Sequence, residues 1–302
     1  MNIGILTRNP EAWCSAQLRK AISSAGSKAK CFWFYDLMSR ISTGPIVNSE
    51  KLPDIVNNLS SLIVRPIGRG SLDEVFFRVN TLHRLNDGGL FVINPPSAIE
   101  RSVDKYYTMS LLSDKGIKVP KTIVTENPDL ALEAFKELGS DVVIKPVFGS
   151  RGMGVTRVTD YEVATRILHN LHYHHLVIYL QQYIPHGDRD IRAFVVGNEV
   201  VAAMFRISKS WKTNVSQGAK PISAKLSSEQ EELAIKAASS IGCLVAGVDI
   251  IQSNDGHYVN EINSQPGFKG LQSVSKINIA EKIVKYVISS INKGSLPTNS
   301  NL

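Results

Sequence analysis

Apolar and polar positions follow two different periods in the first third of the chain. Short runs rich in Ile, Leu, Val and Phe predict buried strands, and longer stretches with apolar residues about every 3.6 positions predict helices. Strands that alternate with helices are typical of a doubly wound parallel sheet, which we expect over residues 1–96. The predicted strands are 1–6, 30–38, 61–68 and 90–94, and the predicted helices are 11–26 and 71–89.

The remainder of the chain changes pattern twice. Up to residue 181 helices and strands still alternate, and a glycine-rich loop interrupts two strands within residues 141–158. After Gly187 the chain is mostly β, with one amphipathic helix at 227–242 and a last helix at 277–292. These changes predict domains at 1–96, 97–181 and 182–293, followed by a polar, flexible tail at 294–302.

Length and composition are those of an ordinary globular protein of about two domains. The chain has 302 residues, of which 43% are hydrophobic and 20% charged. No apolar run approaches the ~20 residues of a membrane span, and the first residues resemble a buried strand more than a signal peptide. The 3 cysteines are odd in number and far apart, which favours free thiols in a reducing cytoplasm.

The net charge of +7 asks for an explanation. Lysine and arginine are dispersed along the chain, without the blocks of a nucleic-acid-binding arm. We therefore expect neither a nucleic acid nor a membrane as partner. An excess of basic residues that is dispersed along the chain is consistent with solvated lysines plus a cleft that binds anions.

Three oxygen-bearing side chains come together in a predicted hairpin near the C-terminus. Two apolar strands flank the turn signal Asn254-Asp255-Gly256. Glu261 and Asn263 are two positions apart on one strand, so they share a face, and Asp249 on the other strand can face them. Two carboxylates and an amide suit Mg²⁺. An exposed hairpin with polar residues on its solvent side is the plainer interpretation of the same pattern.

A glycine-rich loop follows Lys145 at the end of a predicted strand. Glycines let backbone amides approach phosphate oxygens, and an arginine within the loop adds positive charge. The pattern is neither GxxxxGK[ST] nor GxGxxG, and a plain β-turn fits it about as well. Lys105, on the preceding helix, can supply a second cation or be an ordinary surface lysine. The loop residues are Gly149, Ser150, Arg151, Gly152 and Gly154.

Further candidates follow the predicted strand at 176–184. Its end is a possible hinge that offers backbone groups to an adenine edge, with Tyr183 and Ile184 as apolar cover. Asp190 can accept from ribose hydroxyls, and Arg192 and Arg206 suit phosphate or carboxylate groups through bidentate bonds. The polar loop that follows contains Lys212 and Asn214. Exposed arginines on a sheet face are the alternative.

Four histidines cluster on the helix at 161–175 and at its end. A zinc site needs four ligands, and no cysteine or carboxylate stands at a suitable spacing. A surface helix with several imidazoles is the preferred interpretation. These residues are His169, His172, His174 and His175.

Taken in order, six segments resemble the ATP-grasp superfamily and, within it, the RimK-type α-L-glutamate ligases. They are DK at 104–105, VIKPVFGSRGMGV at 143–155, QQYI at 181–184, DIRAFVVG at 190–197, KTN at 212–214, and GVDI with VNEINSQPG at 247–267. The resemblance implies an α/β, ATP-grasp fold. Its parts would be an N-terminal doubly wound, Rossmann-like domain, a small central lid domain and a C-terminal α+β domain.

The resemblance implies an enzyme that joins a carboxylate to an amine through an acylphosphate, with ATP and two Mg²⁺ ions, or Mn²⁺ in their place. Asp249, Glu261 and Asn263 would hold the metal, and Lys145 and Arg206 would stabilise the developing charge. The nucleotide would contact Lys105, Lys145, residues 149–154, Gln182, Tyr183, Ile184, Asp190, Lys212 and Asn214. The family hinge commonly reads QE and its loop FRSN, where this chain has Gln181-Gln182 and WKTN.

The expected substrates are L-glutamate and a carboxylate-bearing acceptor. The resemblance favours a tetrahydromethanopterin-type or deazaflavin-type coenzyme with a glutamate tail. A ribosomal protein C-terminus, an amino-group carrier protein, or a nucleotide-binding protein without turnover are the alternatives. A homo-oligomer, dimer or tetramer, is expected by analogy. The candidate substrate contacts are Arg8, Arg65, Arg69, Arg192, Ser264 and Gly267.

Overall fold

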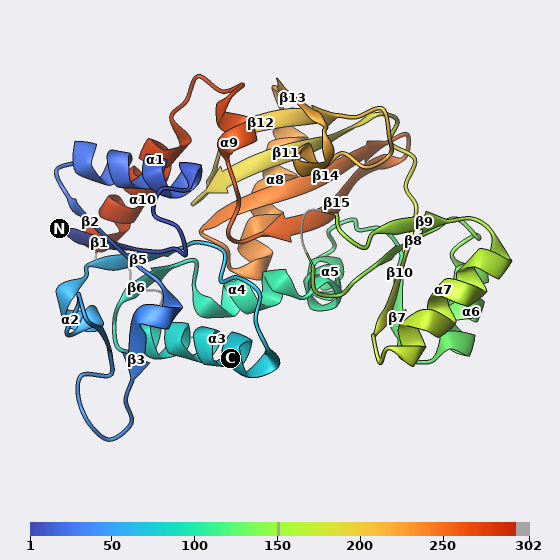
Figure 1. Ribbon diagram of the computed structural model, residues 1–302. Coiled ribbons are helices and arrows are strands. Elements are labelled where there is room, and N and C mark those ends of the chain that lie inside the picture. The colour runs from blue at the N-terminus through green and yellow to red at the C-terminus, as the bar shows by residue number, and fades with distance from the viewer. Residues whose placement is uncertain (150–151, 294–302) are drawn as a thin grey trace.

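The computed structural model describes residues 1–149 and 152–293, and Figure 1 shows three sheets side by side along the molecule. The first sheet is parallel, with strand order β2-β1-β5-β6, as the alternating sequence pattern predicts. Its elements are β1 (Asn2–Leu6), α1 (Trp13–Ser24), β2 (Lys28–Phe32), β5 (Ser61–Val64), α3 (Leu72–Asp87) and β6 (Phe91–Ile93).

The predicted strand at 30–38 is wrong in its second half. β2 ends at Phe32, and a 3₁₀ turn η1 (Phe34–Asp36) follows, because the Asp36 carboxylate accepts from the Trp33 N–H at 3.0 Å. The chain then forms a separate antiparallel hairpin that projects from the N-terminal sheet (Figure 1). Its elements are β3 (Leu37–Ser39) and β4 (Val47–Ser49), followed by the short helix α2 (Ile55–Asn58).

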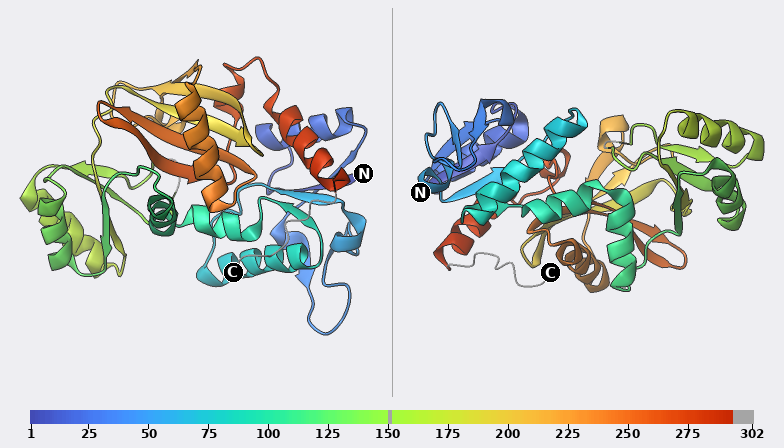
Figure 2. Two further views of the ribbon diagram at one scale, coloured as in Figure 1. Left: turned by 180° about the vertical axis from the view of Figure 1, so that it is seen from behind. Right: turned by 90° about the horizontal axis from the view of Figure 1, so that it is seen from below.

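The second sheet is antiparallel, with strand order β7-β10-β8-β9. Helices α6 and α7 lie together on one face of it (Figure 2), where Phe135, Leu168 and Leu180 form part of a separate small core. The elements are β7 (Thr122–Thr125), α6 (Pro128–Glu137), β8 (Val142–Lys145), β9 (Thr156–Val158), α7 (Tyr161–Tyr173) and β10 (Ile178–Gln182).

The third sheet is also antiparallel, with strand order β13-β12-β11-β14-β15. Helix α8 (Ser228–Ile241) covers one face of it. The capping box at Ser227 and Gln230 starts this helix, and Gly242 in a left-handed conformation ends it. The other elements are β11 (Arg189–Val196), β12 (Glu199–Ile207), η2 (Val215–Gln217), β13 (Lys220–Ser223), β14 (Val245–Ser253), β15 (Gly256–Asn263), α9 (Lys269–Gln272) and α10 (Ile279–Asn292).

Two segments pack away from their neighbours in sequence. The helices α4 (Pro96–Val103) and α5 (Lys105–Asp114) lie on the five-stranded sheet, in one core with α8. The sequence pattern instead suggests that they belong to the predicted domain 97–181. Helix α10 packs against α1 and joins a core that contains strand residues of the N-terminal sheet. Within the described residues, no helix has both the length and the apolar character that crossing a membrane requires.

Candidate functional site

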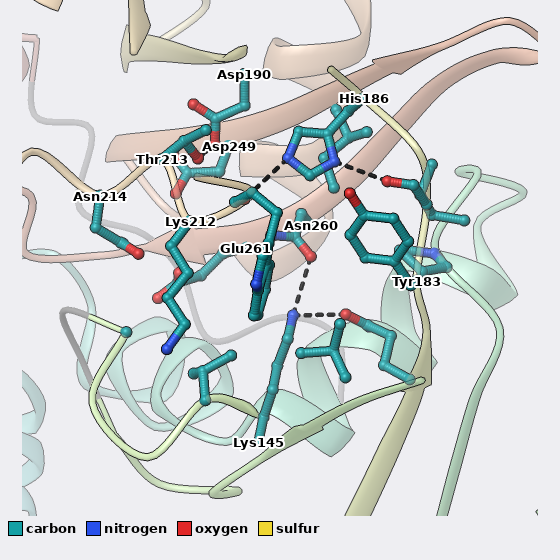
Figure 3. Close-up of a pocket in the computed structure, with 18 of the residues that line it drawn as sticks. Lys145, Tyr183, His186, Asp190, Lys212, Thr213, Asn214, Asp249, Asn260 and Glu261 are labelled. Atoms are coloured by element: carbon teal, nitrogen blue, oxygen red, sulfur yellow. Dashed lines mark hydrogen bonds between the residues drawn. The ribbon is translucent and has the colours of Figure 1, made fainter. Parts of the chain in front are cut away.

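An open cleft lies between the lid sheet, which is the antiparallel sheet of residues 122–182, and the five-stranded sheet (Figure 3). About 900 Å³ of space lies between its walls, part of it open to solvent. Most of the predicted nucleotide and metal contacts line it, and Ser150 and Arg151 lie outside the described residues. The predicted residues in its wall are Lys105, Lys145, Gly149, Gly152, Gln182, Tyr183, Ile184, Asp190, Arg206, Lys212, Asn214, Asp249 and Glu261.

The carboxylates of Asp249 and Glu261 stand directly opposite each other on β14 and β15. The pairing shifts register between Asp249 and Ile250, because Asn260 is an extra residue on β15 without a cross-strand partner. Asn263 pairs with Gly247, two residues further along the strands. The predicted hairpin is therefore present, and a bulge brings Glu261 onto the face of Asp249.

Two arginines hold Asp249. Arg206 Nη2 lies 2.9 Å from its Oδ2, and Arg192 donates to the same oxygen at 2.8 Å. Arg192 also contacts Oδ1 through Nε. Gly247 makes room for this contact, since a Cβ there would stand 2.5 Å from Arg192 Nη1. Asp249 is only 1% exposed, so the pair of arginines replaces water around its charge.

Arg206 is the centre of a buried charge cluster that alternates in sign. It donates from Nε to Asp190 at 2.7 Å and makes a second bond to the same carboxylate through Nη2. Thr213 donates to Asp190 Oδ2 at 2.7 Å. The two carboxylates raise the pKa of Arg206 well above its ordinary value, against the opposing effect of burial. Asp190 thus accepts three bonds from Arg206 and Thr213 and is 3% exposed, so little of its carboxylate is left for the direct ribose contact expected of it.

Glu261 is different from Asp249. Within the described residues its carboxylate makes no hydrogen bond or ion pair, although the cations Lys105 and Lys145 influence it through space. An all-oxygen set with one unengaged carboxylate fits a hard divalent cation. Asp249 can contribute only the lone pairs that its arginines leave, and Asn263 stands on the strand beside the cleft. The residues present therefore fit the predicted Mg²⁺, with Glu261 as the most accessible ligand.

Lys145 points from the end of β8 toward the hairpin (Figure 3). Its Nζ donates to Gln181 Oε1 at 2.5 Å and to Asn260 Oδ1 at 3.0 Å. Burial lowers the pKa of Lys145 to about 8, and Lys105 acts in the same direction while Glu261 and Asp249 oppose it. An ammonium that lacks a carboxylate in bonding distance is suited to meet an anionic ligand.

The glycine-rich loop is held at both ends by the predicted residues. Lys105 Nζ donates to the carbonyl oxygens of Gly149 at 2.9 Å and Val147 at 3.3 Å. Burial is the main cause that lowers the pKa of Lys105. Gly152 has φ +70°, and a Cβ there would stand 2.6 Å from Asn214 Oδ1. Glycine is therefore required where this loop meets the 212–217 segment.

The expected hinge uses part of its backbone within the protein. The N–H groups of Gln182 and Tyr183 donate to Lys121 O at 2.8 Å and Asp141 O at 3.0 Å, so neither is available to an adenine edge. Within the described part of the chain, the N–H of Ile184 donates to no protein acceptor. Arg157 covers the Tyr183 ring at 3.6 Å from its centroid. The backbone groups of the expected hinge that remain for an adenine edge are therefore the Ile184 N–H and the carbonyl oxygens of this segment.

The predicted substrate contacts lie outside this cleft. Arg65 Nη1 donates to Pro266 O at 3.0 Å, and its guanidinium lies over the Phe268 ring. Burial lowers the pKa of Arg65, which has no carboxylate in ion-pair distance among the described residues. Arg69 approaches Met153 of the glycine-rich loop at 4.0 Å. Ser264 is buried, and its hydroxyl accepts from the Ser102 hydroxyl at 2.5 Å. Arg8 and Gly267 are exposed. Gly154, a predicted loop residue, lies near Pro146.

Several residues of the site were not anticipated from the sequence. Asn94 binds the backbone of Val245 through both side-chain atoms, at 2.7 and 2.8 Å, and also contacts Ser264 O. Gln181, His186, Thr213 and Asn260 bond to site residues or their backbone. The histidines of α7 are not part of any group of three His, Cys, Asp or Glu in the described residues that could hold a metal.

Comparisons with known proteins agree with this geometry. Residues 102–287 match the model of the RimK-like ATP-grasp domain. The chain is 33% identical over 323 residues to tetrahydromethanopterin:alpha-L-glutamate ligase of Methanosarcina acetivorans, covering 94% of this chain and 98% of that relative. It is 33% identical over 309 residues to a probable alpha-L-glutamate ligase of Legionella pneumophila, covering 100% and 98%. The solved ATP-grasp ligase PsnB with minimal precursor superposes with a TM-score of 0.76 at 17% identity, over 95% and 98% of the two chains, which bears on the fold alone.

Proposed function

The chain belongs to the RimK-like ATP-grasp family, and from this premise we propose that it adds L-glutamate to a small acceptor with a glutamate tail. Membership confirms the predicted fold and the predicted ATP-dependent ligase, an enzyme class that uses ATP and Mg²⁺. The observation that carries the proposal is the pairing of Asp249 and Glu261 opposite Lys145 in one cleft. The two carboxylates can bind a divalent cation, and the Lys145 ammonium has no carboxylate in bonding distance. Together the cation and the ammonium can receive a triphosphate.

On the nucleotide side, this chain's residues bind and orient. Lys145 and Lys105 neutralise phosphate oxygens, and Gly149, Gly152 and Gly154 belong to the loop over them, of which Ser150 and Arg151 lie outside the described residues. Adenine lies along Gln182, Tyr183 and Ile184, with Ile184 N–H as donor. Lys212 and Asn214 close the cleft on the other side. Asp190 acts through Arg206 and Thr213, because their three bonds leave little of its carboxylate free.

On the metal side, Asp249, Glu261 and Asn263 would hold two Mg²⁺ ions, with Mn²⁺ as a substitute. When bound, the metal would neutralise phosphate charge and favour attack by a carboxylate. Arg206 lies at the floor of the cleft with a fixed positive charge, so it stabilises charge that develops on the transferred group. Gly149, Gly152 and Gly154 would help to exclude water from an activated carboxyl group.

The acceptor side is proposed from the relatives and from charge. Arg65 and Arg69 follow the carboxyl end of β5, where parallel sheets bind ligands. Arg8 follows β1 at the same edge, and Arg192, Ser264 and Gly267 lie toward the magnesium hairpin. An acceptor with a polyglutamate-like tail is anionic and suits these cations. The dimer or tetramer expected by analogy stays a prediction, for which light scattering of the purified protein is the measurement.

The test is a ligation assay with ATP, Mg²⁺ and L-glutamate. One arm contains small compounds with a glutamate tail, and the other contains peptides that end in glutamate. The expected result is ADP release and a mass gain of one glutamyl residue in the first arm. Glu261→Gln is expected to lower the rate at least about a hundredfold, whereas Glu133→Gln, on the exposed face of α6, leaves it unchanged. ADP release without an acceptor, or full turnover in Glu261→Gln, would contradict the proposal.

A further inference from the structure

His186 is placed between two backbone carbonyl groups at the wall of the cleft. Its Nδ1 lies 2.7 Å from Ile184 O, and its Nε2 lies 3.1 Å from Trp211 O (Figure 3). Ile184 belongs to the hinge, and Trp211 directly precedes the segment Lys212–Asn214, which lines the opposite wall. One ring therefore connects the two sides of the proposed adenine pocket.

The two acceptors determine which form of the ring completes both bonds. A carbonyl oxygen has no hydrogen to donate, so each ring nitrogen must carry one. A neutral imidazole has one N–H, and its other nitrogen would then face a carbonyl oxygen, lone pair against lone pair. The imidazolium donates to both oxygens. We call these two bonds, to Ile184 O and Trp211 O, the His186 strap. Both bonds are made only when His186 is doubly protonated.

We propose that His186, as the imidazolium, is a positioning residue that holds the Trp211–Asn214 segment against the nucleotide hinge. The inference rests on the proposed function, because it needs the nucleotide in this cleft. The Tyr183 ring stands 6.1 Å from Trp211 and 5.8 Å from His186, so both aromatic contacts depend on the same connection. His186 touches no atom that reacts. It therefore acts on nucleotide affinity rather than on the chemical step.

Charged groups from several elements line the same cleft as the His186 ring. The cleft cations are Lys105, Lys145, Arg206 and Lys212, and the cleft carboxylates are Asp190, Asp249 and Glu261. Asp188 and Arg189 follow His186 in its own turn. A rise of pH that removes one ring proton leaves one of the two carbonyl oxygens without a donor, and we expect this loss to weaken nucleotide binding.

The experiment measures the Kd of a nonhydrolysable ATP analogue with Mg²⁺ by titration calorimetry between pH 6 and pH 8. Wild type, His186→Gln and the control His172→Gln are compared, the last being a histidine of α7 with one backbone contact. The wild-type Kd is expected to rise at least about tenfold more than that of His186→Gln across this range, the effect of one hydrogen bond from a charged donor. The control is expected to follow the wild type.

A parallel pH response in wild type and His186→Gln overturns the inference, as does an effect on kcat with an unchanged Kd ratio. Should the variant not fold, ¹⁵N-histidine spectra of the wild type decide. They must contain one nucleotide-responsive imidazole that is protonated on both nitrogens at pH 6 and loses one proton by pH 8. Its absence refutes the strap. Binding of the analogue without ligation would instead refute the proposed function and leave this inference standing.

Discussion

Lys145 is expected to destabilise the protein at neutral pH while it serves the nucleotide. Its ammonium is surrounded by Gln181, Asn260 and apolar cleft residues, with no carboxylate in bonding distance. Burial lowers its pKa from the ordinary 10.5 to about 8. Since the unfolded chain holds this proton more tightly than the folded protein, the gap corresponds to about 3 kcal/mol at pH values below 8.

The sign of the pH dependence follows from this difference. Between pH 8 and 10.5 the unfolded state binds more protons than the folded state, so the free energy of unfolding rises with pH in this window. Lys145→Met removes the titrating group. The wild type is therefore expected to gain about 2 kcal/mol relative to Lys145→Met between pH 7.5 and pH 10. The variant is also expected to lose Mg²⁺-dependent ATP binding.

Urea unfolding at the two pH values, followed by tryptophan fluorescence, is the assay. Lys121→Met removes an exposed lysine and controls for the loss of one positive charge. If the unfolding free energies of wild type and Lys145→Met keep a constant difference from pH 7.5 to pH 10, the ammonium is not buried as the structure has it. Unchanged ATP binding in Lys145→Met would refute its place on the phosphates.

Other variants test other parts of the same site. Asp190→Asn leaves the buried Arg206 short of one carboxylate, so we expect a loss of about 3 kcal/mol in unfolding free energy, measured in urea, and slower ADP release. Gly152→Ala strains a backbone with φ +70° and places a Cβ 2.6 Å from Asn214 Oδ1. Nucleotide affinity should fall about tenfold by calorimetry, with unchanged global stability. Phe268→Ala empties a fully buried position between two aromatic rings, and we expect a loss of about 4 kcal/mol in thermal unfolding.

The local patterns of the sequence predicted most of the longer helices and strands, but not the elements within residues 39–60. Period-two runs predicted the strands of the hairpin, and the Asn254-Asp255-Gly256 turn predicted their connection. The resemblance then placed Lys105 and Lys145 near the hairpin, and both line the cleft. The second half of the strand predicted at 30–38 failed because one side-chain bond, from Trp33 N–H to Asp36, overrode the apolar run.

The register of the hairpin formed by β14 and β15 depends on a feature that the sequence pattern does not contain. Counting back from the pair Ser253 and Gly256, a regular hairpin would place Asp249 opposite Asn260. Glu261 would then point to the other face of the sheet. The bulge at Asn260 moves Glu261 opposite Asp249 and leaves the Asn260 amide free to accept from Lys145. A bulge at this point follows from tertiary packing, so sequence periodicity alone could not predict it.

The difference in surroundings between the Asp249 and Glu261 carboxylates is also visible only in the three-dimensional structure. In the sequence Asp249 and Glu261 are equivalent acidic ligands. In the fold, Arg192 reaches Asp249 from the adjacent strand β11 and Arg206 reaches it from β12, one strand further away, and Asp190 in turn holds Arg206. Their side chains meet only because β11 lies between β12 and β14. Glu261, on the edge strand β15, has no such neighbour beyond it, so the carboxylate that the sheet leaves without a counter-charge is the one most open to a cation.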